Sequence, residues 1–434
     1  MTSRDELPPD WFPDGCVLKE KIKHCRQGFD VGIQKALAPI QVLLSTPQER
    51  DGGISVTVIV LGGAYAGVQV AHRLLKYTKP HVRDLKVILV SKNSHFYWNL
   101  AAVRAIVPGI LTEEQYARPI APGFAKYPAD AFEFIVGSAE DVNTANKTVK
   151  VKVGADASER DLTYDYLVVA TGTRNAAATD VPWKNNGTHE EITALLAETQ
   201  KKVKAAKHIV VAGAGATGVE TAAELGFEYG NPKDPAAKKE IVLLSADKEV
   251  LNNDSIAGNV AAELKKLNVT IRGPARVVST NVLPDGKTEV VIENGENIIT
   301  DLYLPTMGMT PNTEFLPAAL LTDKKFVDID EFYSVKGADN VWAAGDVVWK
   351  PRGSFVLSDK QAAGVAKNID AVLKGKSQTP VKTIPIDVLM VATGRSRGAG
   401  RMGPVKAFSL MVYLIKGKTL GVEKLPAWVD GTSF

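Results

Sequence analysis

Cysteine is almost absent from this sequence, which has only Cys16 and Cys25 among its 434 residues. Two cysteines cannot staple a chain of this length, so a disulfide-rich secreted fold is excluded. The two form neither a CxxC nor a CxxxxC pair, and nothing after residue 25 can form a thiol couple. A redox protein with this sequence must therefore move electrons through something other than cysteine.

A strong charge excess and long hydrophobic runs are also missing. The formal net charge is only +3, so no nucleic acid partner is expected, because phosphate-tracking surfaces carry a strong basic excess. No apolar run reaches transmembrane length, and the first residues lack the apolar core of a signal peptide. The composition, 45% hydrophobic and 23% charged, is typical of a soluble globular enzyme, for which a cytoplasmic location is expected.

The most informative segment is VTVIVLGGAYAGVQVAHRLLK, residues 56–76. Its β-branched run predicts a buried parallel strand, and the glycine turn and amphipathic helix that follow are typical of a dinucleotide-binding fold. Such a turn lets the backbone approach a pyrophosphate, while the helix N-terminus offers N–H groups to its charge. The turn contains Gly62, Gly63 and Gly67, with Ala64 at the middle position of the GxGxxG pattern.

The next predicted strand, residues 85–93, ends at Ser91 and Lys92. An Asp or Glu usually stands there and binds the ribose of the adenosine. The pose of that ribose is therefore less secure in this chain.

A second glycine turn follows 151 residues later, in HIVVAGAGATGVETAAEL, residues 208–225. Its GxGxxG pattern is complete, and a second nucleotide fold is therefore predicted. The partner strand has Ser245 at the ribose position, so the carboxylate that selects NADH over NADPH is missing, and either cofactor is expected to be usable. Glu220 is either an ordinary helix residue or a carboxylate that faces the nicotinamide. The three glycines are Gly213, Gly215 and Gly218.

Two further strand ends belong to the same pattern. DYLVVATGTRN, residues 165–175, ends in a close backbone crossing at Thr171 and Gly172, and residues 302–315 form its later counterpart. The strand of residues 339–348 ends at Gly345–Asp346. Asp346 can accept a hydrogen bond from a sugar-like hydroxyl, or it can simply cap the helix that follows.

We therefore predict an α/β fold with two Rossmann-like dinucleotide-binding domains and a small α+β C-terminal domain. No metal site is predicted. The bounds are a partly helical N-terminal extension over residues 1–53, a discontinuous FAD-binding domain over 54–175 and 300–375, an NAD(P)H-binding domain over 176–299, and a C-terminal interface or membrane-contacting domain over 376–434.

In their order and spacing, the two glycine turns, ATGTR and AAGD resemble the glutathione-reductase-like two-domain flavoproteins. Within these, SHFYWNLAAVR (residues 94–104), GAGATGVETAAEL and TPNTEFL are similar to the apoptosis-inducing-factor-like branch, and most of all to the fungal members of its ferroptosis suppressor (mitochondrion-associated inducer of death) group. Type II NADH dehydrogenases are more distant relatives. The resemblance covers roughly residues 55–425, and it is specific for fold and cofactors but much less so for the acceptor.

The resemblance implies FAD and NADH or NADPH as cofactors. The first glycine turn would hold the FAD pyrophosphate, Thr171–Gly172 would pass near the flavin, and Asp346 would bind the ribityl or phosphate portion. Glu220 and Gln361 match residues that lie at the active site of quinone-reducing relatives, which makes them the candidate catalytic residues. The candidate cofactor-binding residues are Gly62, Gly63, Ala64, Gly67, Lys92, Thr171, Gly172, Gly345 and Asp346 for FAD, and Gly213, Gly215, Gly218 and Ser245 for NAD(P)H.

The predicted activity is a ping-pong oxidoreductase that takes a hydride from NAD(P)H and passes electrons to a quinone-like acceptor, because no cysteine pair is available for disulfide reduction. A flavoenzyme that acts on a specialised small metabolite stays open as an alternative. So does an NAD(P)H-sensing signalling or nucleic-acid-binding protein, although the near-neutral charge argues against it.

The C-terminal part is basic, with nine Lys and Arg against three acidic residues from position 376 onward. The excess concentrates in residues 394–418, where an arginine-rich loop precedes the apolar run FSLMVYLI, residues 408–415. An apolar surface ringed by cations suits an anionic membrane, which by resemblance would be the mitochondrial outer surface or a lipid droplet. A dimerisation interface, and hence a homodimer, explains the pattern equally well.

Overall fold

The computed structural model describes residues 55–434, except for residues 155, 178–179, 349 and 351. The predicted N-terminal extension over residues 1–53, with its helical part, lies outside the described residues. Among the residues described, no helix is both long and apolar enough to span a bilayer.

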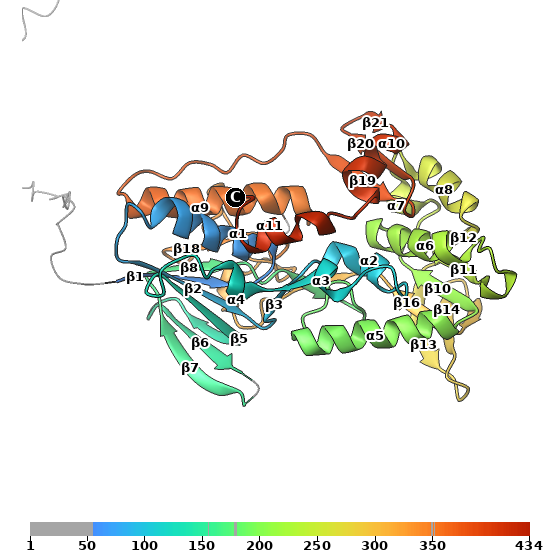
Figure 1. Ribbon diagram of the computed structural model, residues 1–434, viewed down its shortest axis with the longest axis horizontal. Helices are drawn as coiled ribbons and strands as arrows, with labels where there is room; N and C mark the ends of the chain where they lie inside the picture. Colours follow the sequence, from blue (N-terminus) through green and yellow to red (C-terminus); the bar gives the residue numbers. More distant parts are fainter. Residues whose placement is uncertain (1–54, 155, 178–179, 349, 351) are drawn as a thin grey trace, which may run out of the picture. The chain divides into compact units, whose positions relative to one another are not determined.

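The first domain contains a seven-stranded sheet in the order β18-β8-β1-β2-β5-β6-β7 (Figure 1). The strands from β18 to β5 are parallel, and their central members are almost fully buried, because helices cover this part of the sheet. Helices α1 and α9 pack together on one face. The strands are β1 (Val56–Leu61), β2 (Leu85–Ser91), β5 (Phe132–Asn143), β6 (Thr148–Val153), β7 (Ser158–Thr163), β8 (Tyr166–Val169) and β18 (Val341–Ala343); the helices are α1 (Tyr65–Arg73) and α9 (Phe355–Leu373).

The second domain has a four-stranded parallel sheet in the order β12-β11-β10-β16. One boundary differs from the sequence prediction. Strand β16 follows residue 300, where the first domain was expected to resume, but it pairs with β10 and completes the second sheet. The chain returns only at β17 (Met309–Pro311), which pairs with β9 (Thr173–Asn175). The elements are β10 (His208–Ala212), β11 (Glu240–Leu244), β12 (Val269–Arg272), β16 (Leu302–Pro305), the antiparallel meander β13 (Val277–Val282), β14 (Thr288–Ile292) and β15 (Asn297–Thr300), and the helices α5 (His189–Ala205), α6 (Ala216–Tyr229), α7 (Val250–Asn253) and α8 (Ala257–Lys266).

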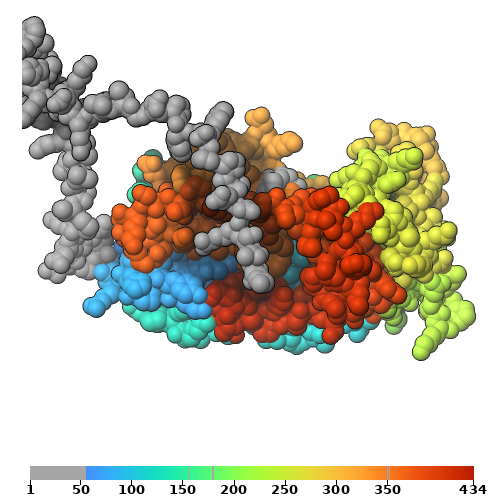
Figure 2. Space-filling model, turned by 90° about the horizontal axis from the view of Figure 1, so that it is seen from above, coloured from blue at the N-terminus to red at the C-terminus, as the bar shows by residue number. Residues whose placement is uncertain are grey.

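The C-terminal part contacts both domains. Its three-stranded sheet contacts α6 and α8 of the second domain, while α11 returns to α1 of the first. Figure 2 shows these residues, in red, packed between the blue first helix region and the yellow-green second domain. The elements are β19 (Val388–Ala392), β20 (Gly398–Met402), β21 (Val405–Ala407), α10 (Ser409–Val412), the π-helical turn η5 (Tyr413–Gly417) and α11 (Leu425–Val429).

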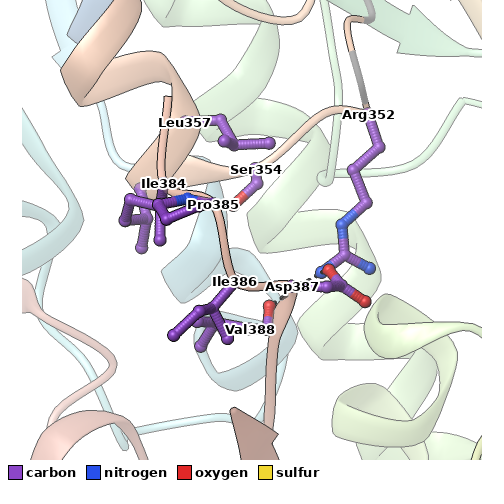
Figure 3. A pocket seen from close by; sticks show the side chains of 9 residues that line it. Arg352, Ser354, Leu357, Ile384, Pro385, Ile386, Asp387 and Val388 are labelled. Atoms are coloured by element: carbon purple, nitrogen blue, oxygen red, sulfur yellow. Dashed lines mark hydrogen bonds and ion pairs between the residues drawn. The ribbon is translucent and has the colours of Figure 1, made fainter. Parts of the chain in front are cut away.

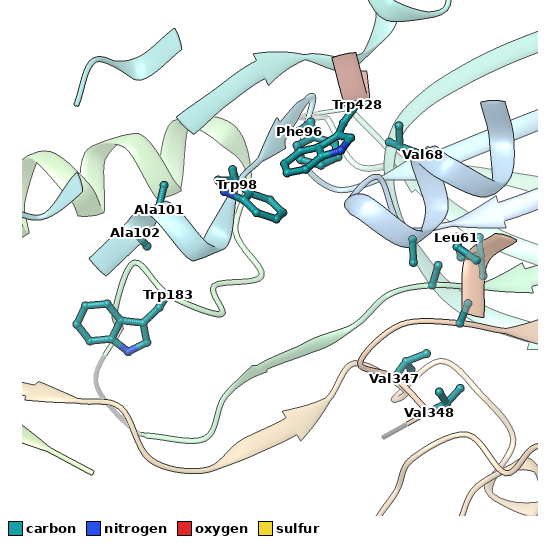
Figure 4. Close-up of a cluster of buried hydrophobic side chains, with 14 of the residues drawn as sticks. Leu61, Val68, Phe96, Trp98, Ala101, Ala102, Trp183, Val347, Val348 and Trp428 are labelled. Carbon is teal, nitrogen blue, oxygen red and sulfur yellow. The ribbon is translucent and has the colours of Figure 1, made fainter. Parts of the chain in front are cut away.

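Aromatic side chains pack the last residues of the chain, around α11, against the first domain. We call residues 420–434 the C-terminal return. The rings of Trp98 and Trp428 lie 4.5 Å apart between centroids, and both are nearly fully buried (Figure 4). The indole N–H of Trp98 donates to the carbonyl of Leu420 at 2.7 Å. Two buried indoles contribute a large apolar area, so this contact is a strong restraint on the C-terminal end. The remaining short elements are η1 (Leu74–Thr78), β3 (His95–Tyr97), η2 (Asn99–Ala101), α2 (Ala102–Ala105), α3 (Glu113–Tyr116), β4 (Ala117–Pro119), α4 (Ile120–Gly123), η3 (Pro235–Ala237), η4 (Ala318–Leu320) and η6 (Val422–Lys424).

Candidate active site

The two helices that follow the glycine turns begin without a side-chain cap. Ala64 precedes α1 and Gly215 precedes α6, and neither first turn contains an acidic residue. Helix α5 differs, because Thr188 and Glu191 form a capping box there. Uncapped N–H groups next to a positive helix end suit an anionic phosphate, so α1 and α6 are built to receive one and α5 is not.

The first glycine turn is packed too closely for any side chain. Gly62 has φ +114°, and a Cβ there would lie 2.3 Å from the carbonyl oxygen of Ala170. A Cβ on Gly67 would lie 1.9 Å from the carbonyl oxygen of Gly62. Gly345 adjoins the same turn, since its Cβ would lie 3.2 Å from that of Ala66. The structure therefore brings together three predicted FAD segments in one backbone cradle that fits a dinucleotide.

The ribose position after β2 is filled by a side chain that points inward. A Cβ on Gly63 would lie 2.5 Å from the Ser91 hydroxyl, which donates to the carbonyl of Asn93 at 2.7 Å. Ser91 therefore packs against the glycine turn. Lys92 is more exposed, and its Nζ lies 3.9 Å from the Glu191 carboxylate. Its role in cofactor binding stays a prediction.

Thr171 and Gly172 lie where the chain crosses to the second domain, and Asn312 holds them there. The Thr171 hydroxyl donates to the Asn312 carbonyl at 2.7 Å, and the Asn312 amide group donates to the Thr171 carbonyl at 2.8 Å. The Asn312 backbone N–H donates to Gly172, and Arg174 donates to the Asn312 side chain. These hydrogen bonds join the segment by which the chain leaves the first domain to the segment by which it returns. We call these two segments the crossings between the domains.

Asp346 forms an ion pair with Lys184, a residue that the sequence prediction missed. Lys184 has a left-handed backbone, with φ 51°, and its own N–H donates to Asn99. Such a conformation is costly for a non-glycine residue and tends to persist at functional sites. Asp346 therefore has a cationic partner in place, and the ion pair would have to open or adapt for the carboxylate to bind a ribityl hydroxyl.

Gln361 is buried in α9 and uses both ends of its amide. Its Oε1 accepts from the Gly345 N–H at 2.8 Å, and its Nε2 donates to the Lys350 carbonyl at 3.0 Å. In this arrangement Gln361 shapes the loop that carries Asp346. A direct role beside the flavin stays a prediction.

The second glycine turn has the same tight geometry as the first. A Cβ on Gly218 would lie 1.8 Å from the Gly213 carbonyl oxygen, and Gly213 has φ +98°. Ser245 is buried, and its hydroxyl donates to the Glu249 carbonyl at 2.9 Å. No carboxylate stands at position 245, so the side chain there supplies no charge that would repel a 2′-phosphate.

Glu220 lies between the second domain and the C-terminal part and is nearly fully buried. Its Oε1 accepts from the backbone N–H of Ala392 at 2.9 Å and from Lys416 Nζ at 2.6 Å. Lys416 also donates to the Met390 carbonyl at 3.0 Å and retains partial exposure. These two partners fix the direction of a carboxylate that lies two residues after Gly218, the last glycine of the second glycine turn.

One turn further along α6, Glu224 is also buried and faces two guanidinium groups. Arg104 donates to its Oε1 at 2.9 and 2.7 Å, and Arg395 Nε lies 3.4 Å from its Oε2. Burial raises the pKa of Glu224, while hydrogen bonding and charge from Arg104, together with the charge of Arg395, oppose that rise. Arg104 also donates to the carbonyls of Gly417 and Lys418 at the π-helical turn.

These cations were missed as partners because they are distant in sequence. One signal was present: Glu220, Glu224 and Glu228 are spaced four residues apart, so they share one face of α6. Two buried carboxylates on one face require cationic partners, since an unpaired buried charge is very costly. The partners stood within segments already singled out, with Arg104 in SHFYWNLAAVR and Lys416 beside the apolar run.

Much of the basic excess in residues 394–418 is used within the protein. Arg395 pairs with Glu228 at 2.5 Å, and Arg401 pairs with Asp254 at 2.8 Å through a bidentate contact. Hydrogen bonding to Arg401 holds the pKa of Asp254 below its usual value. These arginines therefore join the C-terminal part to the second domain.

Comparison with known proteins assigns the fold. The family model described as pyridine nucleotide-disulphide oxidoreductase matches residues 56–364. Oxidoreductase ptaL of Pestalotiopsis fici is 40% identical over 86% of this chain and 99% of its own length. Ferroptosis suppressor protein 1 of Xenopus tropicalis is 25% identical over 85% of this chain and 95% of its own. The resemblance to the ferroptosis suppressor group of apoptosis-inducing-factor-like proteins is thus confirmed.

Among solved structures, the sulfide:quinone oxidoreductase from Aquifex aeolicus has a TM-score of 0.65 at 17% identity, covering 86% of this chain and 92% of its own. This likeness concerns the fold alone. Together with the family match it confirms the predicted fold class of a two-domain flavoprotein.

Proposed function

The chain belongs to the pyridine nucleotide-disulphide oxidoreductase family, and from this premise we propose that it is an NAD(P)H:quinone-type oxidoreductase with a ping-pong mechanism. Its cofactors are FAD and NADH or NADPH, as the sequence predicts. Bound FAD would supply the two-electron relay between the nicotinamide and the acceptor. Overall, NAD(P)H, one proton and the quinone become NAD(P)⁺ and the hydroquinone.

The proposal rests on two observations together: the buried Glu220 pairs with the partly exposed Lys416, and the region matched by the family model contains no cysteine. Cys16 and Cys25 both precede residue 56, so the region that matches the family contains no dithiol. Without a dithiol to receive the electrons of the reduced flavin, we expect a small diffusible molecule to be the electron acceptor. Lys416 Nζ is a group that can hold the proton that the acceptor takes up, because it contacts Glu220 and is 21% exposed on its side chain.

Glu220 in this proposal orients the nicotinamide and holds Lys416. Changing Glu220 to Gln preserves an acceptor for the Ala392 N–H but removes the charge that pairs with Lys416. We expect Glu220→Gln to retain FAD while slowing one half-reaction by about 10- to 100-fold, which is the loss of one charge-assisted hydrogen bond.

The test is anaerobic stopped-flow spectroscopy on the FAD-loaded protein. Rapid flavin bleaching by NADH or NADPH, followed by rapid reoxidation with a short-chain ubiquinone, supports the proposal. Flavin bleaching without reoxidation by quinones would overturn the assignment of a quinone as the electron acceptor. It would favour a flavoenzyme that acts on a specialised small metabolite. No bleaching by either nucleotide would favour a sensing role. Glu263→Gln, which removes the carboxylate of the ion pair with Lys266 on α8, is the matched control and should behave as the parent.

We further propose that the C-terminal part touches an anionic membrane. Six apolar side chains there are 43–84% exposed, and exposed Arg397, Lys406 and Lys418 belong to the same segment. Apolar contact supplemented by about 1 kcal/mol per nearby cation supports binding to an anionic surface. We call this the C-terminal apolar patch, made of Met402, Val405, Phe408, Leu410, Leu414 and Ile415.

Sedimentation with phosphatidylserine-containing vesicles tests this contact. The double change Phe408→Ser and Leu414→Ser should release the protein from vesicles, because both side chains are more than 60% exposed and their loss leaves the core intact. Val282→Ser, an exposed apolar residue on β13, is the control. Equal sedimentation of parent and double variant would overturn the proposal, and a parent dimer dissociated by the double change would assign the patch to a subunit interface.

A further inference from the structure

A cavity of about 330 Å³ opens between the start of α9 and the segment that leads into β19. Figure 3 shows Ile384, Pro385 and Ile386 on one side and Arg352 on the other, with Ser354 and Leu357 between them. Ligand sites are typically concave, mostly apolar and supplied with a few polar groups. This cavity has that character, and its volume lies at the small end of such sites, where a one- or two-ring molecule fits.

The cavity adjoins the loop assigned to FAD. Leu357 lines it, and Gln361 lies one helical turn further along α9, where its Oε1 accepts from Gly345. Ser354 precedes the first turn of α9 and makes no capping hydrogen bond with its side chain. Its hydroxyl and the N-terminal N–H groups of α9 are therefore polar groups at the cavity wall.

Arg352 is held at the rim by groups that can release it. It pairs with Asp387 and donates to the Val388 carbonyl at 2.7 Å. Asp387 has a second partner, since Arg401 donates to its Oδ2 at 2.6 Å. If Arg352 turns from Asp387 to a ligand, Asp387 keeps its ion pair with Arg401. The carboxylate of Asp387 is therefore not left unpaired.

We propose that this cavity binds the electron acceptor and that the acceptor is a fused-ring quinone with an ionised oxygen substituent. The aliphatic side chains receive the ring system, and the Arg352 guanidinium receives the anionic oxygen through charge-assisted hydrogen bonds. The inference rests on the proposed quinone reductase activity and adds to it the site and the chemical class. Val356 and Ile386 are 38% and 52% exposed, so the acceptor enters directly from solvent.

The test compares two quinones of one ring size. 2-Hydroxy-1,4-naphthoquinone is ionised at neutral pH, whereas 1,4-naphthoquinone is neutral. Binding of each to the oxidised holoprotein is measured by titration of the flavin spectrum, and reduction is measured separately. Arg352→Gln should weaken binding of the hydroxyquinone about 10- to 100-fold, as expected for a lost charge-assisted hydrogen bond, and leave the neutral quinone within about threefold. Arg276→Gln, at an exposed ion pair with Glu293 just before β13, is the control.

A second variant tests the cavity itself. Val356→Trp places bulk at a partly exposed lining position and should weaken binding of both quinones, while flavin bleaching by NAD(P)H stays unchanged. Equal effects of Arg352→Gln on both quinones, or normal quinone binding in Val356→Trp, would overturn the inference. Failure of the parent to reduce any quinone would instead overturn the proposed function, so the two failures are distinguishable.

Discussion

At the scale of single residues, His72 shows how one neutral side chain holds the C-terminal return in place. The imidazole is fully buried and stacks on Phe124 with 3.8 Å between ring centroids. Its Nε2 lies 2.9 Å from the carbonyl of Val429, which can only accept, so Nε2 carries the proton and Nδ1 accepts from the Tyr127 hydroxyl at 3.0 Å. Burial, with smaller contributions from Lys126 and Lys76, lowers the pKa of His72 to about 4.

This predicts a loss of stability in mild acid. The unfolded chain takes up a proton on His72 near pH 6.5, while the folded protein resists it until about pH 4. The free energy of unfolding should therefore fall as pH drops through this window, by up to about 3 kcal/mol for the full shift. Thermal melting of the parent and His72→Gln between pH 7.5 and 5 checks it. The variant should have a lower Tm at pH 7.5 but a shallower decline. Parallel declines would contradict the prediction.

Individual residues also show where sequence reasoning stops. Gly62 and Gly213 could be placed because each glycine turn is a local pattern whose backbone demands are contained in a few residues. The partners of Glu220 and Asp346 could not, since Lys416 and Lys184 are brought near only by the complete tertiary fold. Sequence predicts the need for a partner at a buried charge, but not which cation meets it.

At the scale of elements, helix α6 is joined to α2 and to the π-helical turn η5 through one guanidinium. The wider winding of η5 leaves the carbonyls of Gly417 and Lys418 directed at Arg104, which also pairs with Glu224. Both side chains of this pair are at most 3% exposed. A single group thus satisfies acceptors from two elements that are far apart in sequence.

Breaking this pair on one side should be severe. Arg104→Met leaves Glu224 buried with Arg395 as its remaining nearby cation, and we expect a loss of about 3–5 kcal/mol in the free energy of unfolding. Arg104→Met combined with Glu224→Met removes both charges and should recover a large part of that loss. Chemical denaturation of the three proteins checks the order. Arg272→Met, at the exposed pair with Glu296, is the control and should cost at most about 1 kcal/mol.

If the double variant were as unstable as the single one, the uncompensated charge would not be the cause. The lost hydrogen bonds to the carbonyls of η5 would then account for the effect.

At the scale of the whole molecule, Asn312 determines how firmly the two crossings between the dinucleotide-binding domains are joined. Its side chain donates to Thr171 and accepts from Arg174, in a position that is 6% exposed. Asn312→Ala removes both bonds and should lower the free energy of unfolding by about 1–3 kcal/mol and slow flavin reduction. Melting curves and stopped-flow traces check it, with the exposed Asn281→Ala as control. Unchanged flavin reduction in Asn312→Ala would show that this lock does not set the domain geometry.

The large-scale architecture was predictable because each domain repeats a strand–turn–helix pattern with strong local signals. The predicted residue at which the chain returns to the first domain, residue 300, was wrong. Residues 302–305 read as a strand, but nothing in their own sequence says which sheet they join, and pairing with β10 is a non-local choice. The C-terminal charge excess predicted a surface that contacts a membrane or a second subunit, and that contact stays a prediction. Part of the excess has partners within the chain, because Arg395 pairs with Glu228 and Arg401 with Asp254.

The pairing of β9 with β17 places the two ends of the second domain side by side, since Asn175 lies opposite Met309. Residues 176–308 are therefore a cassette whose first and last residues adjoin each other. A segment of this kind can be exchanged between homologous reductases without changing the structure of the domain that receives it. A transplanted cassette would carry its own choice of nicotinamide coenzyme. The C-terminal part is what such a graft must be matched to, because its cations recognise carboxylates that the cassette brings with it.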